Sequence, residues 1–133
     1  MDSHARERIQ NIASKKLVME KDKSIKIIHN TYTKSRGAPE LLDIFCKNCN
    51  IYVMTYQKDG LGELLRCYLD RIHLPENLQK RQFEYQKGRK NISLVCHNCN
   101  TVIGTPMIYK TENRPAYHMI KEKSSFTKHK LPR

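Results

Sequence analysis

The chain has 133 residues and a formal charge of +12, with 25 Lys or Arg against 13 Asp or Glu. Its length suits one compact domain, and 38% apolar residues can fill a core, which argues against wholesale disorder. No apolar run approaches the roughly 18 residues that span a bilayer, and the charged residues 1–8 do not resemble a secretory signal. We therefore expect a cytoplasmic protein, in which cysteines serve as metal ligands or thiols more often than as disulfides.

The N-terminal part is predicted to contain a helix and a strand. Ser3 can cap a helix over residues 3 to about 20, because apolar side chains recur there at helical spacing. Residues 1–23 are therefore assigned to an N-terminal helical arm. The isoleucine-rich residues 24–33 predict a strand, and residues 34–39 have the composition of a loop.

A hairpin and a second helix are predicted next. Short apolar runs at 41–45 and 51–56 flank a pair of cysteines and predict a hairpin. An amphipathic helix is then predicted over residues 61–73, within an inserted segment 60–74, and Pro75 would end it. Its apolar stripe consists of Leu61, Leu64, Leu65, Tyr68, Leu69 and Ile72.

The C-terminal part is predicted to be mainly strands. Residues 76–91 are polar and basic and predict a loop. Around a second pair of cysteines, residues 92–95 and 101–109 are strand-like, and residues 115–121 predict one more strand. We place the folded domain at 24–121 and expect residues 122–133 to form a mobile basic tail.

The two cysteine pairs lie in matching segments. Residues 45–51 and 95–101 each contain the pattern C-x-N-C-N. Two cysteines three residues apart in a tight turn can direct both sulfurs at one ion, and backbone amides beyond them can donate hydrogen bonds to the thiolates. Four thiolates complete a tetrahedral zinc site with no open position for water. The predicted ligands of one structural zinc ion are Cys46, Cys49, Cys96 and Cys99.

Other residues bear on this metal site. Asn50 and Asn100 follow the second cysteine of each pair, where the chain must reverse, and Asn tolerates the left-handed conformation well. Iron is the alternative ion for the same four sulfurs. We expect the fifth cysteine, Cys67, to be a partly buried spare thiol. Four histidines could replace a ligand, although a surface or core position is expected for each: His29, His73, His97 and His118.

The paired C-x-N-C-N turns between short hairpins resemble a rubredoxin-like zinc ribbon. The segment 56–62 and the segment 68–72 are in addition similar to small uncharacterised bacterial zinc-ribbon proteins. The resemblance implies an α+β fold, in which a zinc ribbon of short antiparallel hairpins is clamped by the four cysteines. With the elements predicted above, this ribbon would carry an N-terminal helix and an inserted amphipathic helix. The resemblance implies no activity.

A second similarity would imply an enzyme. Residues 69–75, followed by residues 91–100, are similar to the HNH endonuclease pattern. That chemistry needs a histidine base and a metal on the phosphate. Here Arg71 stands where the base is needed, His73 comes two residues late, and a strand is predicted after Cys99 where that family has a helix. Phosphate-loop, H-E-x-x-H and G-x-S-x-G motifs are missing too, so we name no catalytic residue and favour a binding protein over an enzyme.

The excess positive charge is unevenly spread and indicates a polyanionic partner. It is +4 over residues 1–40, zero over 41–75, +3 over 76–91 and +5 over 92–133. Nucleic acid, RNA before DNA, is the predicted partner, since Lys and Arg release counterions from phosphates, with Tyr52, Tyr56 or Tyr85 available for stacking. An adaptor that presents an edge strand or a basic face to an acidic protein is the alternative. The candidate contacts are Lys80, Arg81, Lys87, Arg89, Lys90, Lys128 and Lys130.

Overall fold

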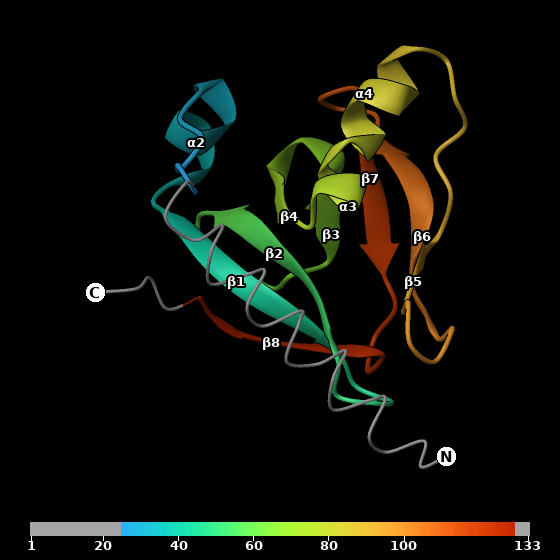
Figure 1. The fold of residues 1–133 in the computed structure, drawn as a ribbon. Coiled ribbons are helices and arrows are strands. Elements are labelled where there is room, and N and C mark those ends of the chain that lie inside the picture. Colours follow the sequence, from blue (N-terminus) through green and yellow to red (C-terminus); the bar gives the residue numbers. More distant parts are fainter. Residues whose placement is uncertain (1–24, 130–133) are drawn as a thin grey trace, which may run out of the picture.

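The computed structural model describes residues 25–129 and has an α+β fold (Figure 1). The predicted helix over residues 3–20 lies outside the described residues, as does Lys130. In chain order the elements are α2 (Thr31–Arg36), β1 (Pro39–Cys46), β2 (Tyr52–Asp59), β3 (Arg66–Tyr68), the 3-10 turn η1 (Leu69–Arg71), β4 (Ile72–Leu74), α3 (Glu76–Gln79), α4 (Arg81–Gln86), β5 (Leu94–Val95), β6 (Val102–Tyr109), β7 (Arg114–Met119) and β8 (Ser124–Lys128).

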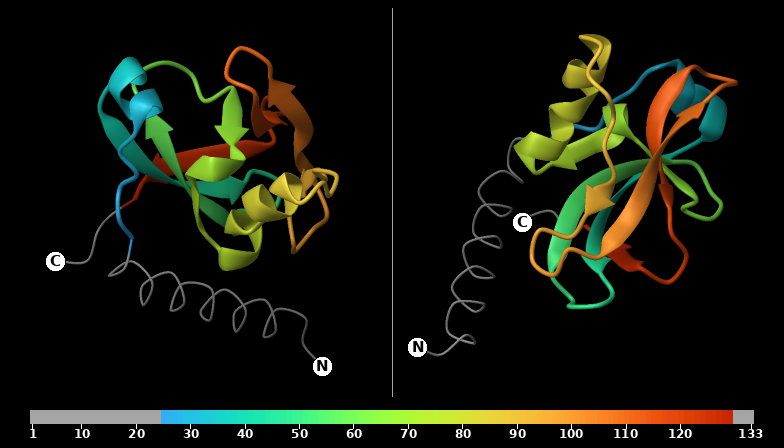
Figure 2. Two further views of the ribbon diagram at one scale, coloured as in Figure 1. Left: turned by 90° about the horizontal axis from the view of Figure 1, so that it is seen from above. Right: turned by 90° about the vertical axis from the view of Figure 1, so that its right-hand side faces the viewer.

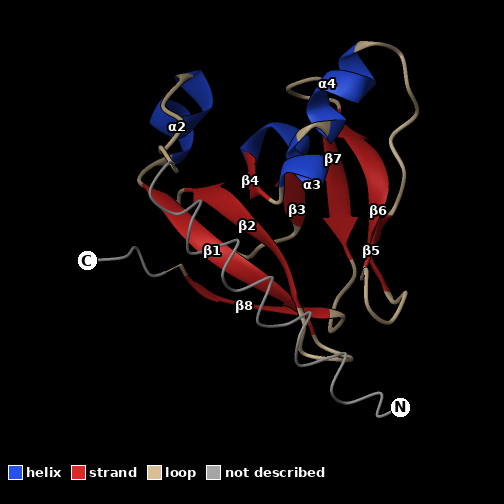
Figure 3. Cartoon of the chain, in the orientation of Figure 1, coloured by secondary structure: helices blue, strands red, loops and turns tan. Residues whose placement is uncertain are grey.

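The strands form two four-stranded antiparallel sheets. The first has the order β4-β2-β1-β8 and the second the order β3-β7-β6-β5. Each sheet is built on a long hairpin, β1–β2 in one and β6–β7 in the other (Figure 3). The predicted strands on both sides of the two cysteine pairs are therefore confirmed, with somewhat different bounds.

One hydrophobic core joins the two sheets. Ile44 and Met54 from the first sheet and Ile103 and Tyr117 from the second are all fully buried and belong to the same cluster. The cysteine pairs adjoin this core, because Cys46 and the other three paired cysteines either belong to it or pack against it. A metal ion between the pairs would therefore connect the sheets where they already touch.

The predicted helix over 61–73 is wrong. This stretch forms β3, η1 and β4, so that β3 belongs to one sheet and β4 to the other. Leu61, which the helix would have placed on its apolar stripe, is 103% exposed, whereas the charged Arg71 is 1% exposed. Gly60 and Gly62 adopt φ values of 83° and 113°, which a helix cannot accommodate. Pairing of β3 with the distant β7 then decides the structure, since tertiary contacts override local preference.

Three further predictions need correction. The described part of the predicted strand over 24–33, residues 25–33, is not a strand: residues 25–30 lead into α2, whose first amides are capped by the side chain of Asn30 in a capping box with Thr33. Residues 76–91 are not a simple loop, because they contain α3 and α4. The expected mobile tail is a strand over 124–128, since β8 uses backbone hydrogen bonds to the open edge of β1 and needs few apolar side chains for this.

The close approach of Gly60 to α2 yields a matched pair of variants. A Cβ at Gly60 would collide with the carbonyl of Arg36, whereas one at Gly62 would meet nothing within 4 Å; both residues have positive φ. Gly62→Ala is expected to cost about 1–2 kcal/mol of unfolding free energy from backbone strain alone. Gly60→Ala is expected to cost about 1–3 kcal/mol more, from overpacking. Urea unfolding of both variants measures the difference, and equal costs would contradict this packing.

Candidate metal centre

Four cysteine side chains from two different hairpins converge at one end of the sheets. Cys46 ends β1 and Cys49 lies in the turn to β2, whereas Cys96 and Cys99 lie in the turn between β5 and β6. Their sulfur atoms are all within 4.8 Å of one another. The sulfurs of Cys46 and Cys99 are 3.6 Å apart, as are those of Cys49 and Cys96. Both of these close contacts therefore run between the hairpins.

These distances suit one metal ion. All four cysteines are free thiols. Four sulfurs placed at about 2.3 Å from a tetrahedral ion lie roughly 3.8 Å apart, close to the 3.6 Å between the hairpins. The cluster can therefore hold a metal ion with little movement of the chain. It is the only grouping of three or more Cys, His, Asp or Glu with metal-binding geometry among residues 25–129.

The two turns have the same backbone geometry. The backbone N–H of Asn50 donates to the carbonyl of Cys46 at 2.7 Å, and the backbone N–H of Asn100 donates to the carbonyl of Cys96 at 2.9 Å. Both asparagines adopt the left-handed conformation expected from the sequence, with φ values of 61° and 62°. The first cysteine of each pair also donates its own amide across the turn, at 2.9 Å in both cases. Each turn is thus held in the shape that directs two sulfurs at one point.

Hydrogen-bond donors surround the second pair of sulfurs. Asn48 Nδ2 donates to Cys99 Sγ at 3.5 Å, and the hydroxyl of Thr101 lies 3.0 Å from it. The bond from Asn48, followed by those from Thr101, lowers the pKa of Cys99 to about 5. Burial raises the pKa of Cys96 to about 12, although the amides of Asn98 and Cys99 act in the opposite direction. The donors directed at Cys99 favour its thiolate, the form that binds metal.

The four candidate histidines, all within residues 25–129, do not join the cluster. His97 Nε2 lies 3.2 Å from the carbonyl oxygen of Tyr52, so it connects the two cysteine turns without being a ligand. His73 Nε2 is 3.0 Å from Gln57 Oε1, and burial, with the neighbouring Arg71, lowers its pKa. His29 and His118 are exposed. The expected surface or internal positions are therefore found.

The fifth cysteine is a core residue. Cys67 is 0% exposed on β3, and burial raises its thiol pKa well above the usual value. It is more deeply buried than the sequence predicted. A thiol in this state is a poor nucleophile, so Cys67 is structural.

The predicted nucleic-acid contacts are divided by the fold. Lys80 is exposed just before α4, and Lys87, Arg89 and Lys90 are exposed after it, whereas Lys128 is on β8, well away from α4 in Figures 1 and 2. Lys128 also forms an ion pair with Glu40 at 3.3 Å.

Several other side chains that were predicted to contact nucleic acid make contacts within the protein instead. Arg81 is partly buried and donates to the hydroxyl of Tyr117 at 2.6 Å. Tyr56 is 2% exposed and cannot stack on a base, and Tyr85 packs partly against the core. Tyr52 is also partly buried, with its hydroxyl 2.6 Å from that of Thr55.

The residues behind the nuclease similarity have structural contacts. Asp70 accepts from Arg114 at 2.6 Å, and Arg71 is buried against Asp59 at 2.8 Å. The chain after Cys99 forms the strand β6, where a nuclease of that family would have a helix. The geometry does not favour a catalytic site there.

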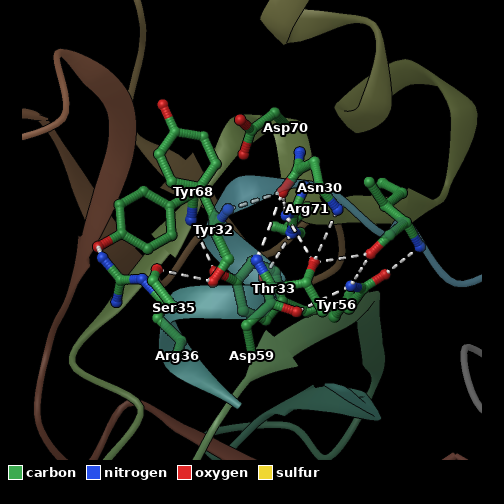
Figure 4. A network of polar contacts seen from close by, with 12 residues as sticks. Asn30, Tyr32, Thr33, Ser35, Arg36, Tyr56, Asp59, Tyr68, Asp70 and Arg71 are labelled. Atoms are coloured by element: carbon green, nitrogen blue, oxygen red, sulfur yellow. Dashed lines mark hydrogen bonds and ion pairs between the residues drawn. The ribbon is translucent and has the colours of Figure 1, made fainter. Parts of the chain in front are cut away.

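Sequence reasoning missed a stack of arginines and tyrosines, part of which is drawn in Figure 4. The guanidinium carbon of Arg114 lies 3.9 Å from the ring centre of Tyr32 and 3.8 Å from that of Tyr68. That of Arg66 lies 4.0 Å from the ring centre of Tyr109. These residues come from α2, β3, β6 and β7, so no local spacing in the sequence could have indicated the stack.

No protein-family model, curated protein or solved structure matches this chain. Within residues 25–129, no helix combines the length and the apolar character that crossing a membrane requires.

Proposed function

We propose that the four cysteines bind one structural zinc ion, and that the domain it organises is a basic module that contacts nucleic acid. The convergence of four sulfurs from two hairpins is the observation that carries the zinc proposal. Zinc held by four thiolates keeps no position for water or substrate, which makes its role structural. Because one hairpin belongs to each sheet, the ion would fix the two sheets to each other.

Zinc is favoured over iron for this site. Both ions accept four thiolates, and the donors around Cys99 would support either. An electron carrier would have no use for a charge of +12, however, whereas a structural zinc is common in proteins that bind polyanions. The proposed cofactor is therefore a single zinc ion with the ligands Cys46, Cys49, Cys96 and Cys99.

The proposed nucleic-acid contact is the segment 80–90, which contains α4. Lys80, Lys87, Arg89 and Lys90 are all exposed there, and few acidic groups oppose them. One of these is Glu76, which pairs with Lys80 at 3.2 Å. Exposed cations within a short stretch can neutralise successive phosphates, and the released counterions favour binding at low salt. An exposed aromatic lies in the same segment, since Phe83 is 50% exposed, and it replaces the tyrosines as the stacking candidate.

A matched pair of triple variants tests this contact. Changing Lys87, Arg89 and Lys90 together to Gln removes three charges from the segment. At about 50 mM salt, this variant is expected to bind a labelled single-stranded RNA at least tenfold more weakly than the unchanged protein. The slope of log K against log salt should fall by about 2, at roughly 0.7 per lost phosphate contact. Fluorescence anisotropy from about 50 to 200 mM salt measures both quantities, and DNA of the same sequence shows the preference.

The control variant removes the same charge elsewhere. Lys110, Lys121 and Lys123 are exposed and lie outside the segment, so their change to Gln should have a much smaller effect. Equal losses in the two variants would contradict a localised contact. Failure of the unchanged protein to bind either nucleic acid at about 50 mM salt would contradict the proposal itself, because phosphate contacts are strongest there.

An adaptor for an acidic protein is the second candidate. It is favoured by β8, an edge strand that pairs only with β1 and exposes four of its five residues. Phe126 on this strand is 53% exposed. An extended acidic segment could add a strand there.

A further inference from the structure

We propose that a pocket beside the arginine–tyrosine stack binds the phosphate group of a phosphate monoester. The pocket lies between the end of β2, the start of β3 and the start of β7, and it has a volume of about 90 Å³. It differs from the metal centre and from the segment around α4, so the proposal does not depend on either.

The pocket lies at the opposite end of the sheets from the cysteines. Asp59 pairs with Pro39 at the end of the β1–β2 ladder that is remote from the cysteine turn. Arg114 likewise pairs with Tyr109 at the far end of the β6–β7 ladder. Since β1 has eight residues, the two sites are roughly 20 Å apart at about 3.3 Å per residue.

The lining of the pocket is rich in cationic side chains. Five basic side chains contribute to it, against the two carboxylates of Asp59 and Glu63. Two more carboxylates, of Asp70 and Glu112, pair with lining arginines from outside the pocket, which leaves an excess of one positive charge. Such an excess in a partly enclosed site attracts a multiply charged anion. The basic residues are Arg36, Lys58, Arg66, Arg71 and Arg114.

Three of these arginines, Arg36, Arg71 and Arg114, already have carboxylate partners. Arg71 is paired with Asp59 at 2.8 Å, and Arg114 with Asp70 at 2.6 Å. Arg114 also donates to Glu112 at 3.0 Å. Burial alone would raise the pKa of Glu112, but hydrogen bonds from Arg114 and Arg36 lower it. The N–H groups in these pairs build the pocket wall and are not the free donors.

Arg66 and Arg36 retain unused donors. Arg66 donates from Nε to the hydroxyl of Tyr68 at 3.3 Å, and no carboxylate of residues 25–129 forms an ion pair with it. Arg36 pairs with Glu112 at 2.8 Å, yet its Nε has no hydrogen-bond partner although it is buried. A guanidinium with free N–H groups suits phosphate, which it can bind through two parallel hydrogen bonds.

The aromatic stack holds these guanidinium groups in place. The Arg66 guanidinium carbon lies 4.0 Å from the ring centre of Tyr109, and that of Arg36 lies 5.1 Å from the ring centre of Tyr68. Tyr68 OH in addition accepts from Arg36 at 3.0 Å. Because the side chains are already ordered, a ligand does not have to immobilise them, which lowers the entropic cost of binding.

The pocket has room for a phosphate group. Its volume of about 90 Å³ is several times the roughly 10–15 Å³ that one water needs in a cavity. The rim is apolar, with Leu61 at 103% and Leu65 at 55% exposed. The rest of a monoester would lie over this rim, so a nucleoside 5′-monophosphate should bind better than inorganic phosphate.

Calorimetric titration with small ligands tests the proposal. Inorganic phosphate and adenosine 5′-monophosphate are expected to bind, whereas adenosine is not. Oligonucleotides with a 5′-phosphate or a 5′-hydroxyl then identify the source of the phosphate group. Tighter binding of the 5′-phosphorylated oligonucleotide would indicate that the pocket binds the 5′ end of a nucleic acid. Equal affinities of the two oligonucleotides would indicate that its ligand is a free nucleotide. Equal binding of adenosine and its monophosphate, or no binding of either phosphate, would overturn the proposal.

Variants of Arg66 locate the binding site. Arg66→Gln is expected to weaken binding of the monophosphate about tenfold or more, which is the loss of one charge-assisted contact. Arg66→Lys keeps the positive charge but loses the parallel N–H donors of the guanidinium group. Its affinity for the monophosphate should therefore lie between those of the unchanged protein and of Arg66→Gln. Lys121→Gln, two residues beyond the end of β7 that is remote from the pocket, removes one charge and should change the affinity little.

A variant at a second position tests the same pocket in case the Arg66 variant does not fold. Arg36→Gln is expected to weaken binding similarly, and circular dichroism of each variant verifies the fold. Unchanged affinity in folded Arg66→Gln and Arg36→Gln proteins would overturn the assignment of the pocket.

Discussion

Treatment with a chelator that removes the proposed zinc ion is expected to abolish the cooperative thermal transition of the domain. The ion would join two hairpins from separate sheets through four sulfurs that lie within 4.8 Å of one another. A structural zinc ion contributes about 10–16 kcal/mol to folding, whereas a domain has about 5–15 kcal/mol of net stability. Loss of the ion should therefore outweigh what the remaining core supplies. Circular dichroism during heating, with and without EDTA, measures this.

A pair of cysteine variants separates the metal from ordinary packing. Cys96 and Cys67 are both 0% exposed, but only Cys96 belongs to the sulfur cluster. Cys96→Ala is expected to lose the metal and the cooperative transition. Cys67→Ala should keep the metal and melt only several degrees lower, because it loses a small buried side chain. An unchanged melting temperature in EDTA, or equal behaviour of the two variants, would contradict a structural metal.

Breaking the buried ion pair between Arg71 and Asp59 is expected to have the second largest effect. Their side chains are only 2% and 4% exposed, and Arg71 Nε lies 2.8 Å from Asp59 Oδ2. Arg71 also donates to Asn30 at 2.6 Å, which attaches α2 to the rest of the fold (Figure 4). Asp59→Ala would leave the guanidinium buried without its carboxylate, at a cost of about 3–5 kcal/mol.

An exposed ion pair supplies the control. Glu76 and Lys80 lie 3.2 Å apart with side chains 57% and 60% exposed, and Glu76→Ala should cost no more than about 1 kcal/mol. Urea unfolding of both variants compares the two pairs. A cost for Asp59→Ala as small as that for Glu76→Ala would show that Arg71 is solvated and not buried as described.

The cysteine cluster could be predicted from the sequence because its determinants are local. The two sulfurs of each pair are three residues apart, and the left-handed Asn50 and Asn100 follow directly. Everything that shapes one turn lies within about six residues. What the sequence could not provide was the distance between the two turns, since this depends on how the sheets pack.

The failed helix prediction has the opposite cause. The apolar stripe from Leu61 to Ile72 has helical spacing, yet Leu61 and Leu65 are exposed and Cys67 is buried. The partner of β3 is β7, with Cys67 opposite Tyr117, fifty positions further along the chain. A pairing over that distance cannot be seen in the local periodicity of the sequence. Only Gly60 and Gly62, which adopt positive φ, are local features that argue against a helix.

The roles of the charged residues likewise depend on contacts between distant parts of the chain. Composition indicated a basic protein but could not distinguish Arg81, which is tied to Tyr117, from Lys87, which is exposed. Nor could it show that Arg66 and Arg114 belong to one stack with Tyr68. Which cations are available to a partner is decided by tertiary contacts, and these require the structure.

X-ray absorption at the zinc edge, on protein purified without added chelator, tests the central claim most directly. One zinc ion per chain with four sulfur neighbours at about 2.3 Å is the expected result. Nitrogen or oxygen neighbours in place of some sulfurs, iron in the site, or no bound metal in protein that is nevertheless folded would contradict it.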